Sequence, residues 1–211
     1  MLENRSVLGD IVAGKPSERF ESDEERFFSW YCDDLVVAGY LDRYEVKPNT
    51  FIISTSVFYP TLVVKKTKSI VKERCLVDGH SYTPDFLLFW NPSAFGVFYY
   101  DLDRTTEYLN CPFLAQTRII GGKEQIVSTI EVKGGFDEHN MTRLFHANQK
   151  IVLAKFGVFV QKVTAHGAKS GGLFKNTFTP DRFLLTDKSM KPRKIHFTTR
   201  TLGEFVRCLK R

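Results

Sequence analysis

The apolar run Phe86-Leu-Leu-Phe-Trp90, which directly follows Pro84-Asp85, is the feature that most constrains the fold of this chain. Five consecutive apolar residues after a turn residue are typical of a buried β-strand. Proline is tolerated at the first position of a strand, and it pushes the preceding Thr83 towards an extended conformation. We therefore expect residues 86–90 to form a buried strand, with Asp85 at its mouth.

A second strand pattern lies in Thr129-Ile-Glu-Val-Lys-Gly134, where the charged Glu131 and Lys133 flank the apolar Val132. Side chains alternate between the two faces of a strand, so the two charged residues should project together while the valine enters the core. Glu131 would then meet Asp85 from the neighbouring strand. Two carboxylates and a few waters make a typical Mg²⁺ site, and an adjacent lysine can orient an attacking water.

Each of these motifs alone has an ordinary structural explanation. A lone Glu-x-Lys on a strand is usually a solvated ion pair, and a lone Thr-Pro-Asp is usually a turn. Ser22-Asp-Glu-Glu25, which opens the first helical pattern, is equally a capping box in which the two end residues satisfy backbone N–H groups. The combination favours a functional site, because both strand motifs adjoin apolar runs where an unpaired charge is costly to bury.

Three motifs follow one another along the chain: Ser22-x-x-Glu25, Pro84-Asp85 and Glu131-Val132-Lys133. This order resembles the PD-(D/E)xK nuclease superfamily, which includes restriction enzymes, Holliday junction resolvases and a transposon-end-cutting endonuclease. The resemblance covers about residues 20–165 and looks closest to small phage-type nucleases. It implies a restriction-endonuclease-like α/β fold, with a central mixed sheet, flanking helices and an αβββαβ core.

The resemblance also implies a role for each motif residue. Asp85 and Glu131, helped by the Val132 carbonyl, would bind Mg²⁺, or Mn²⁺ in its place. Lys133 would orient the attacking water and counter the charge that builds on the scissile phosphate. Glu25 would bind the metal through water or hold a second ion.

The first helix and the other elements can be placed from the sequence pattern. Ser22 should cap a helix that continues to about Ala38 and ends at Gly39. Glu24 competes with Glu25 as the carboxylate of this helix, and we prefer Glu25 on the resemblance alone. The other predicted elements are a helix over 138–154 and strands at 50–64, 70–77, 86–90, 95–100, 126–132 and 157–163.

The chain of 211 residues suits one compact domain with a sizeable core. Within it we expect a flexible leader over 1–18, a nuclease core over 19–165 with an insertion at 91–128, and a basic C-terminal extension over 166–211. Two short strand signals in the extension precede a helix from Thr201, where Thr201-x-x-Glu204 makes a second capping box.

Lysine and arginine outnumber aspartate and glutamate by 30 to 24, and the basic residues are clustered. Such clusters neutralise phosphates and release counterions, although a solvated basic surface is the ordinary alternative. The helix after Glu-x-Lys presents further polar candidates for phosphate contact. The predicted nucleic-acid contacts are Lys65, Lys66, Lys68, Arg143, Gln149 and Lys150; other basic positions are Lys72, Arg74, Lys188, Lys191, Arg193, Lys194, Arg200, Arg207, Lys210 and Arg211.

Several other classes are disfavoured. No apolar run approaches the ~20 residues that a membrane-spanning helix needs, and the charged N-terminus is not a signal peptide. Gly9-x-x-x-x-Gly14-Lys15 fails as a phosphate-binding loop because Pro16 replaces the metal-binding serine or threonine. The four cysteines lack any Cys-x-x-Cys pair, so we expect reduced cysteines in a cytoplasmic protein.

Together these patterns predict a Mg²⁺-dependent DNA endonuclease that acts on duplex or branched DNA, such as a Holliday junction, in a phage or mobile element. We expect a homodimer, because cutting two strands needs two active sites. The alternatives are a transposon-end-cutting subunit, a catalytically inactive nucleic-acid-binding module with a nuclease fold, and a structural or assembly protein of a phage or mobile element.

Overall fold

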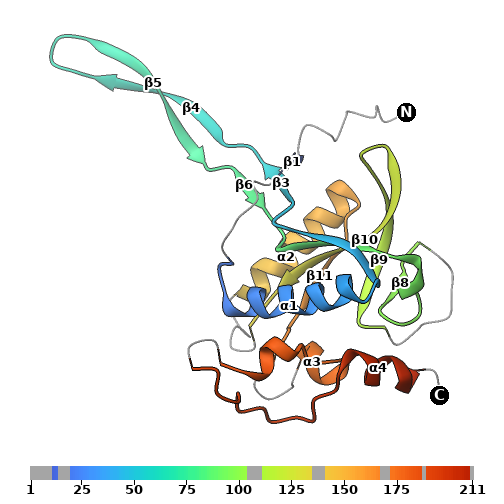
Figure 1. The fold of residues 1–211 in the computed structure, drawn as a ribbon. Helices are drawn as coiled ribbons and strands as arrows, with labels where there is room; N and C mark the ends of the chain where they lie inside the picture. Colours follow the sequence, from blue (N-terminus) through green and yellow to red (C-terminus); the bar gives the residue numbers. More distant parts are fainter. Residues whose placement is uncertain are drawn as a thin grey trace.

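A computed structural model describes residues 11–13, 20–103, 111–134, 141–166, 172–186 and 189–209. The chain is a mixed α/β protein built around one central sheet (Figure 1). The strands of this sheet follow the order β2-β7-β10-β9-β8, and β11 pairs with β10. Their bounds are β2 Leu41–Val46, β7 Phe86–Trp90, β8 Tyr99–Asp101, β9 Phe113–Ile120, β10 Lys123–Val132 and β11 Val160–Val163. The α/β class and the mixed central sheet predicted from the sequence are thus confirmed.

Strand β10 positions the candidate site, because it changes its partner halfway along. Its first half forms a hairpin with β9, whereas its second half runs parallel to β11, from Thr129↔Val160 to Val132↔Val163. On its other edge it pairs antiparallel with β7, and the last pair on that side is Ile130↔Phe86. The residue before Phe86 and the residue after Ile130 therefore lie at the same end of two neighbouring strands.

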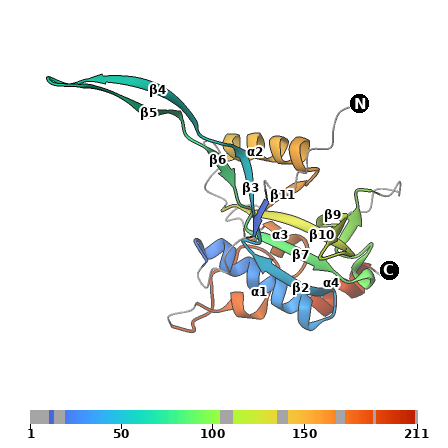
Figure 2. The same ribbon diagram turned by 90° about the horizontal axis from the view of Figure 1, so that it is seen from above.

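Helix α1, Asp23–Val37, covers one face of the sheet and was correctly predicted. Its N-cap is Ser22, and Gly39 follows its C-terminus with a φ of +75°, a conformation that glycine adopts without strain. Helix α2, Met141–Phe156, lies on the opposite side of the sheet (Figure 2). The pleat explains both layers: Ile130 and Val132 of β10 join the core under α1, whereas Glu131 faces the other side.

The C-terminal segment is an integral part of the core. It contains α3 Gly172–Asn176, the 3₁₀ helix Asp181–Leu184 and α4 Leu202–Leu209. Its aromatic rings pack on α1: Phe178 stacks on Tyr31 with 4.2 Å between ring centroids, and Phe183 meets Phe27 edge-on at 4.9 Å. The capping box at the start of α4 is formed as expected. The two short strand signals are not: in their place lie the 3₁₀ helix and one bridge, Leu185↔Pro192.

The strands expected at 50–64 and 70–77 exist but lie outside the central sheet. Residues Asn49–Ser54 form β3, which pairs with β1 Ile11–Ala13 and β6 His80–Tyr82 in a small sheet. Strands β4 Val57–Val64 and β5 Ser69–Val77 pair only with each other. They form a two-stranded ribbon that projects far from the body (Figures 1 and 2); we call residues 57–77 the arm.

Three further segments differ from expectation. The first strand of the central sheet is β2, which the sequence analysis did not predict. Residues 91–128, expected as an insertion, contribute β8 and β9 to the central sheet, and the strand expected at 95–100 is reduced to β8. Within the leader, residues 11–13 form β1, and the rest of that segment lies outside the described residues. No helix in the described part of the chain has both the length and the apolar character to cross a membrane.

Candidate active site

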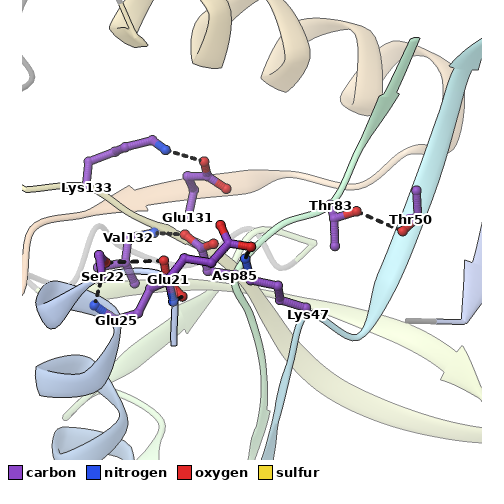
Figure 3. Close-up of polar contacts among 10 residues, drawn as sticks. All are labelled: Glu21, Ser22, Glu25, Lys47, Thr50, Thr83, Asp85, Glu131, Val132 and Lys133. Carbon is purple, nitrogen blue, oxygen red and sulfur yellow. Dashed lines mark hydrogen bonds and ion pairs between the residues drawn. The ribbon is translucent and has the colours of Figure 1, made fainter. Parts of the chain in front are cut away.

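The four side chains predicted to form a catalytic site line one cleft of about 300 Å³. Glu25 comes from the first turn of α1, Asp85 from the residue before β7, and Glu131 and Lys133 from the end of β10 (Figure 3). These three segments are far apart in sequence. The antiparallel pairing of β7 with β10 brings two of them together, and the packing of α1 on the sheet adds the third.

Asp85 is a buried carboxylate whose environment opposes its negative charge. Its Oδ2 accepts a hydrogen bond from the Val132 backbone N–H at 2.8 Å, while its own carbonyl accepts from the Lys47 N–H. Burial raises the pKa of Asp85 to about 7, and the neighbouring carboxylates of Glu131 and Glu25 act in the same direction. The Val132 N–H and the Lys133 ammonium oppose this rise without cancelling it. A cation bound here would relieve the same repulsion.

Glu131 is also buried, and both of its carboxylate oxygens have partners. Oε1 forms an ion pair with Lys133 Nζ at 2.7 Å, and Oε2 accepts a hydrogen bond from the Tyr82 hydroxyl at 2.8 Å. The expectation that Glu131 and Lys133 project together while Val132 enters the core is therefore confirmed. Burial and the nearby Glu131 charge raise the pKa of Tyr82 well above its ordinary value, so this hydroxyl remains a donor.

Glu25 forms the capping box that its motif allowed. Ser22 Oγ accepts from the Glu25 N–H and donates to Glu25 Oε1, both at 3.2 Å, and Oε2 accepts from the Glu21 N–H. The capping box thus exists, and it holds a buried carboxylate at the wall of the cleft. The side chain of Glu24, the competing carboxylate, packs over Gly134, the residue that follows Lys133. A Cβ added to Gly134 would lie only 3.0 Å from Glu24 Oε1.

Further residues of the cleft were not predicted from the sequence. Tyr82 and His80 project from β6 into it, and His80 Nε2 lies 2.8 Å from Oδ1 of Asn148, a buried side chain on α2. Lys47, half-buried with φ +48°, forms an ion pair with Glu21 at the edge of the cleft. The alternation His80-x-Tyr82, directly before Pro84-Asp85, is the sequence signal that could have identified two of these residues.

The donor atoms of the cleft suit a hard divalent ion. Asp85 and Glu131 supply carboxylate oxygens, which Mg²⁺ prefers, and this ion commonly takes one or two protein carboxylates and keeps several waters. Asp85 Oδ1 accepts no hydrogen bond from the described residues, and each ionised oxygen has more than one lone pair to offer. Within the described part of the chain, no group of three or more His, Cys, Asp or Glu side chains is arranged to hold a metal ion.

The predicted nucleic-acid contacts fall into two groups. Lys65, Lys66 and Lys68 are exposed in the turn at the tip of the arm, far from the cleft (Figure 1). On α2, Arg143 and Lys150 are exposed. Gln149, the third predicted contact on this helix, is different, because its Nε2 donates to the Val160 carbonyl at 2.6 Å and thereby joins α2 to β11.

The basic residues of the C-terminal segment include two with structural roles. Arg193 lies over the rings of Phe27 and Phe183 and donates to the carbonyls of Phe183 and Leu185. Arg200 donates to two carbonyls at the end of α3. These guanidinium groups stabilise the packing of the segment, and their donors are directed at backbone oxygens. Lys188, Lys210 and Arg211 lie outside the described residues.

No family model, no curated protein and no solved structure shows a significant match to this chain.

Proposed function

We propose that this protein is a Mg²⁺-dependent DNA endonuclease of the PD-(D/E)xK type. The observation that supports the proposal is the convergence of Glu25, Asp85, Glu131 and Lys133 on one cleft from three separate segments. When β3–β6 and the added sheet strands β8 and β9 are left aside, the order α1-β2-β7-β10-α2-β11, with β10 antiparallel to β7 and parallel to β11, is compatible with the αβββαβ core that the sequence resemblance implies. We accordingly interpret the fold as restriction-endonuclease-like.

In this proposal Asp85 and Glu131, together with the Val132 carbonyl, hold the ion at the end of β7 and β10. When bound, Mg²⁺ supplies a positive charge beside the scissile phosphate and lowers the pKa of a bound water. The protein residues keep the two carboxylates in place: the Val132 N–H fixes Asp85, and the Tyr82 hydroxyl fixes Glu131. Such supporting hydrogen bonds orient metal ligands and tune their affinity.

Lys133 is the cationic group of the proposed reaction. Its ammonium lies 2.7 Å from Glu131 Oε1, on the side of the sheet that faces the cleft. From there it can hold the attacking water and counter the negative charge that grows on the phosphate oxygens as the P–O bond to the leaving sugar oxygen breaks. Glu25, buried in its capping box, would contact the hydrated ion through water.

The basic residues away from the cleft would position the DNA backbone. Lys65, Lys66 and Lys68 at the tip of the arm, with Arg143 and Lys150 on α2, are exposed cations that phosphates can reach. Contacts of this kind fix the orientation of the duplex without reading its sequence. All four cysteines are free, which suits a reducing compartment, and we propose that the enzyme acts in the cytoplasm of the cell that harbours it.

One observation favours a second candidate, a nucleic-acid-binding module without activity. Both oxygens of Glu131 have partners, one in Lys133 and one in Tyr82. The protein's own side chains therefore neutralise part of the negative charge in the cleft. A fold that had lost its metal would stabilise its buried carboxylates in this way.

The experiment that separates the two candidates is plasmid nicking with Mg²⁺ or Mn²⁺ by the purified full chain. We expect cleavage by the wild type, and a loss of at least about 10²–10³-fold for Asp85→Asn and for Lys133→Met. Matched controls come from the far end of the same strand, where Lys123→Met and Glu124→Gln replace exposed side chains. Nicking that is equal in all variants would reject the proposed catalytic residues. Nicking that is absent in all of them while DNA binding persists would reject the nuclease and favour the binding module.

A further inference from the structure

The arm has two chemically different faces. In an antiparallel ladder, directly paired residues project to the same side, and successive pairs alternate. The register is known along the ribbon, apart from a shift next to the Val57↔Val77 pair at its base. One face, which we call the apolar face, carries the pairs Phe58↔Cys75, Pro60↔Glu73, Leu62↔Val71 and Val64↔Ser69. The opposite, basic face carries Tyr59↔Arg74, Thr61↔Lys72 and Val63↔Ile70.

The apolar face is bare, whereas the basic face is partly covered. Leu62, Val64 and Val71 are 62%, 73% and 68% exposed, and Phe58 is 56% exposed. On the basic face, by contrast, Val63 is only partly exposed. Lys72 and Arg74 belong to that face, and their long hydrocarbon stems can shield it. Contiguous exposed apolar side chains of this kind mark an interaction surface.

A two-stranded ribbon in water is marginally stable unless a further layer covers its apolar face. The edges of the arm do not favour a third strand. Pro60 has no N–H to offer on the β4 side, and proline and charged residues are the usual devices that block strand addition. The partner must therefore pack on the face of the ribbon and must itself be apolar.

We propose that the apolar face of the arm packs against the same face of a second copy of this chain, about a two-fold axis. Side chains of this size carry on the order of 100 Å² of apolar surface each, so the four exposed ones on each of the two arms would bury roughly 800 Å² together. That area is smaller than that of a standard interface and is typical of a weak, reversible dimer. A two-fold contact uses one self-complementary patch on both copies, which a flat ribbon face provides.

The charge on the arm determines how the two copies are oriented. Residues 57–77 contain five basic side chains and one acidic side chain, so two arms repel each other at long range. Parallel packing would bring the Lys65, Lys66 and Lys68 turns of both copies together. Antiparallel packing places these turns at opposite ends and turns both basic faces outward. The dimer therefore leaves the basic residues free for another ligand, and its formation does not depend on the proposed nuclease activity.

The test is the mass of the full chain in solution by sedimentation equilibrium, without DNA or metal and with a reducing agent. We expect the wild type to be dimeric at about 100 µM. Leu62→Asn/Val71→Asn, a cross-strand pair on the apolar face, should raise the dimer dissociation constant at least about tenfold. Val63→Asn/Ile70→Asn makes the same chemical change on the next pair of the opposite face and should leave the dimer intact.

A salt series on the wild type gives a second measurement that needs no variant. Because apolar contact holds the copies together while like charges oppose it, dimerisation should be unchanged or stronger at high salt. A wild-type monomer at about 100 µM, equal dimerisation of the two double variants, or a dimer that dissociates at least about tenfold more at high salt would each overturn the proposal. A monomer with an intact fold would point instead to a different protein as the occupant of the apolar face.

Discussion

The cleft and the arm reverse the usual distribution of residues in opposite ways. In the cleft, carboxylates that normally face water are buried: Glu25, Asp85 and Glu131 are 5%, 7% and 7% exposed. On the arm, side chains that normally form a core face solvent. Both arrangements cost free energy in the isolated chain, the first through desolvation of charge and the second through hydration of apolar surface. Under the two proposals, each arrangement would be offset by a bound species: a cation in the first region and an apolar partner in the second.

The largest effect that we expect is that of Asp85→Asn on the free energy of unfolding, which tests whether the cleft holds its carboxylates at a cost. Because its folded-state pKa is raised, Asp85 binds its proton more tightly in the folded protein than in the unfolded chain. The contribution of Asp85 to the free energy of unfolding is therefore favourable at low pH, and it is lost as the pH rises from about 4 towards 7. A rise from 3.8 to about 7 corresponds to about 4 kcal/mol as an upper limit. Asp85→Asn should accordingly raise the free energy of unfolding of the metal-free protein at pH 8, and much less at pH 4.

Urea unfolding in the presence of a chelator, at several pH values, measures this difference. If Asp85 holds the ion as proposed, added Mg²⁺ should then stabilise the wild type and leave the variant unchanged. The control is Glu124→Gln, which alters an exposed carboxylate on the same strand as Glu131. If Asp85→Asn destabilises the metal-free protein at pH 8, the carboxylate is not held at a cost, and the contrast between the two regions fails.

A smaller effect is expected for Tyr82→Phe, which removes the hydroxyl that donates to Glu131 Oε2. Loss of a hydrogen bond that supports a metal ligand typically lowers metal affinity or activity about 10–100-fold. Mg²⁺ titration followed by thermal unfolding, together with nicking rates over a range of Mg²⁺ concentrations, would detect it. Tyr99→Phe alters a tyrosine buried in the core under α1, away from the cleft, and serves as the control for simple loss of stability. Activity that is restored by excess Mg²⁺ fits a positioning role, whereas unchanged Mg²⁺ dependence argues against it.

The smallest effect is expected at the tip of the arm. Replacing Lys65, Lys66 and Lys68 together with glutamine should weaken DNA binding and reduce the slope of log K against log salt by about 0.9 for each lost phosphate contact. The unfolding free energy should change little, because these side chains are exposed. Fluorescence anisotropy with a labelled duplex at several salt concentrations measures the slope. An unchanged slope would show that the tip of the arm does not contact DNA, and the apolar face would then be the one interaction surface proposed for the arm.

The parts of the molecule that were predicted from sequence depend on local patterns. Ser22 and Gly39 mark the ends of α1 because caps are local, and the alternation around Val132 shows which side chains share a face because the strand period is local. The parts that were missed depend on distant pairing. Strand β2 is an edge strand that mixes charged and apolar residues, so its pattern is weak. The strand character of the arm is visible in its sequence, but whether another layer covers it is not.

The hydrogen bond from the Val132 N–H to the Asp85 carboxylate has a practical consequence. At this end of the sheet the amide hydrogen of Val132 is held by a titratable carboxylate, and the ladder between β10 and β7 has already ended two residues earlier, at Ile130. Its NMR resonance should therefore report on proton and ion occupancy together, as a single built-in probe. The same signal, followed during titration, would reveal whether the two species compete for one oxygen pair.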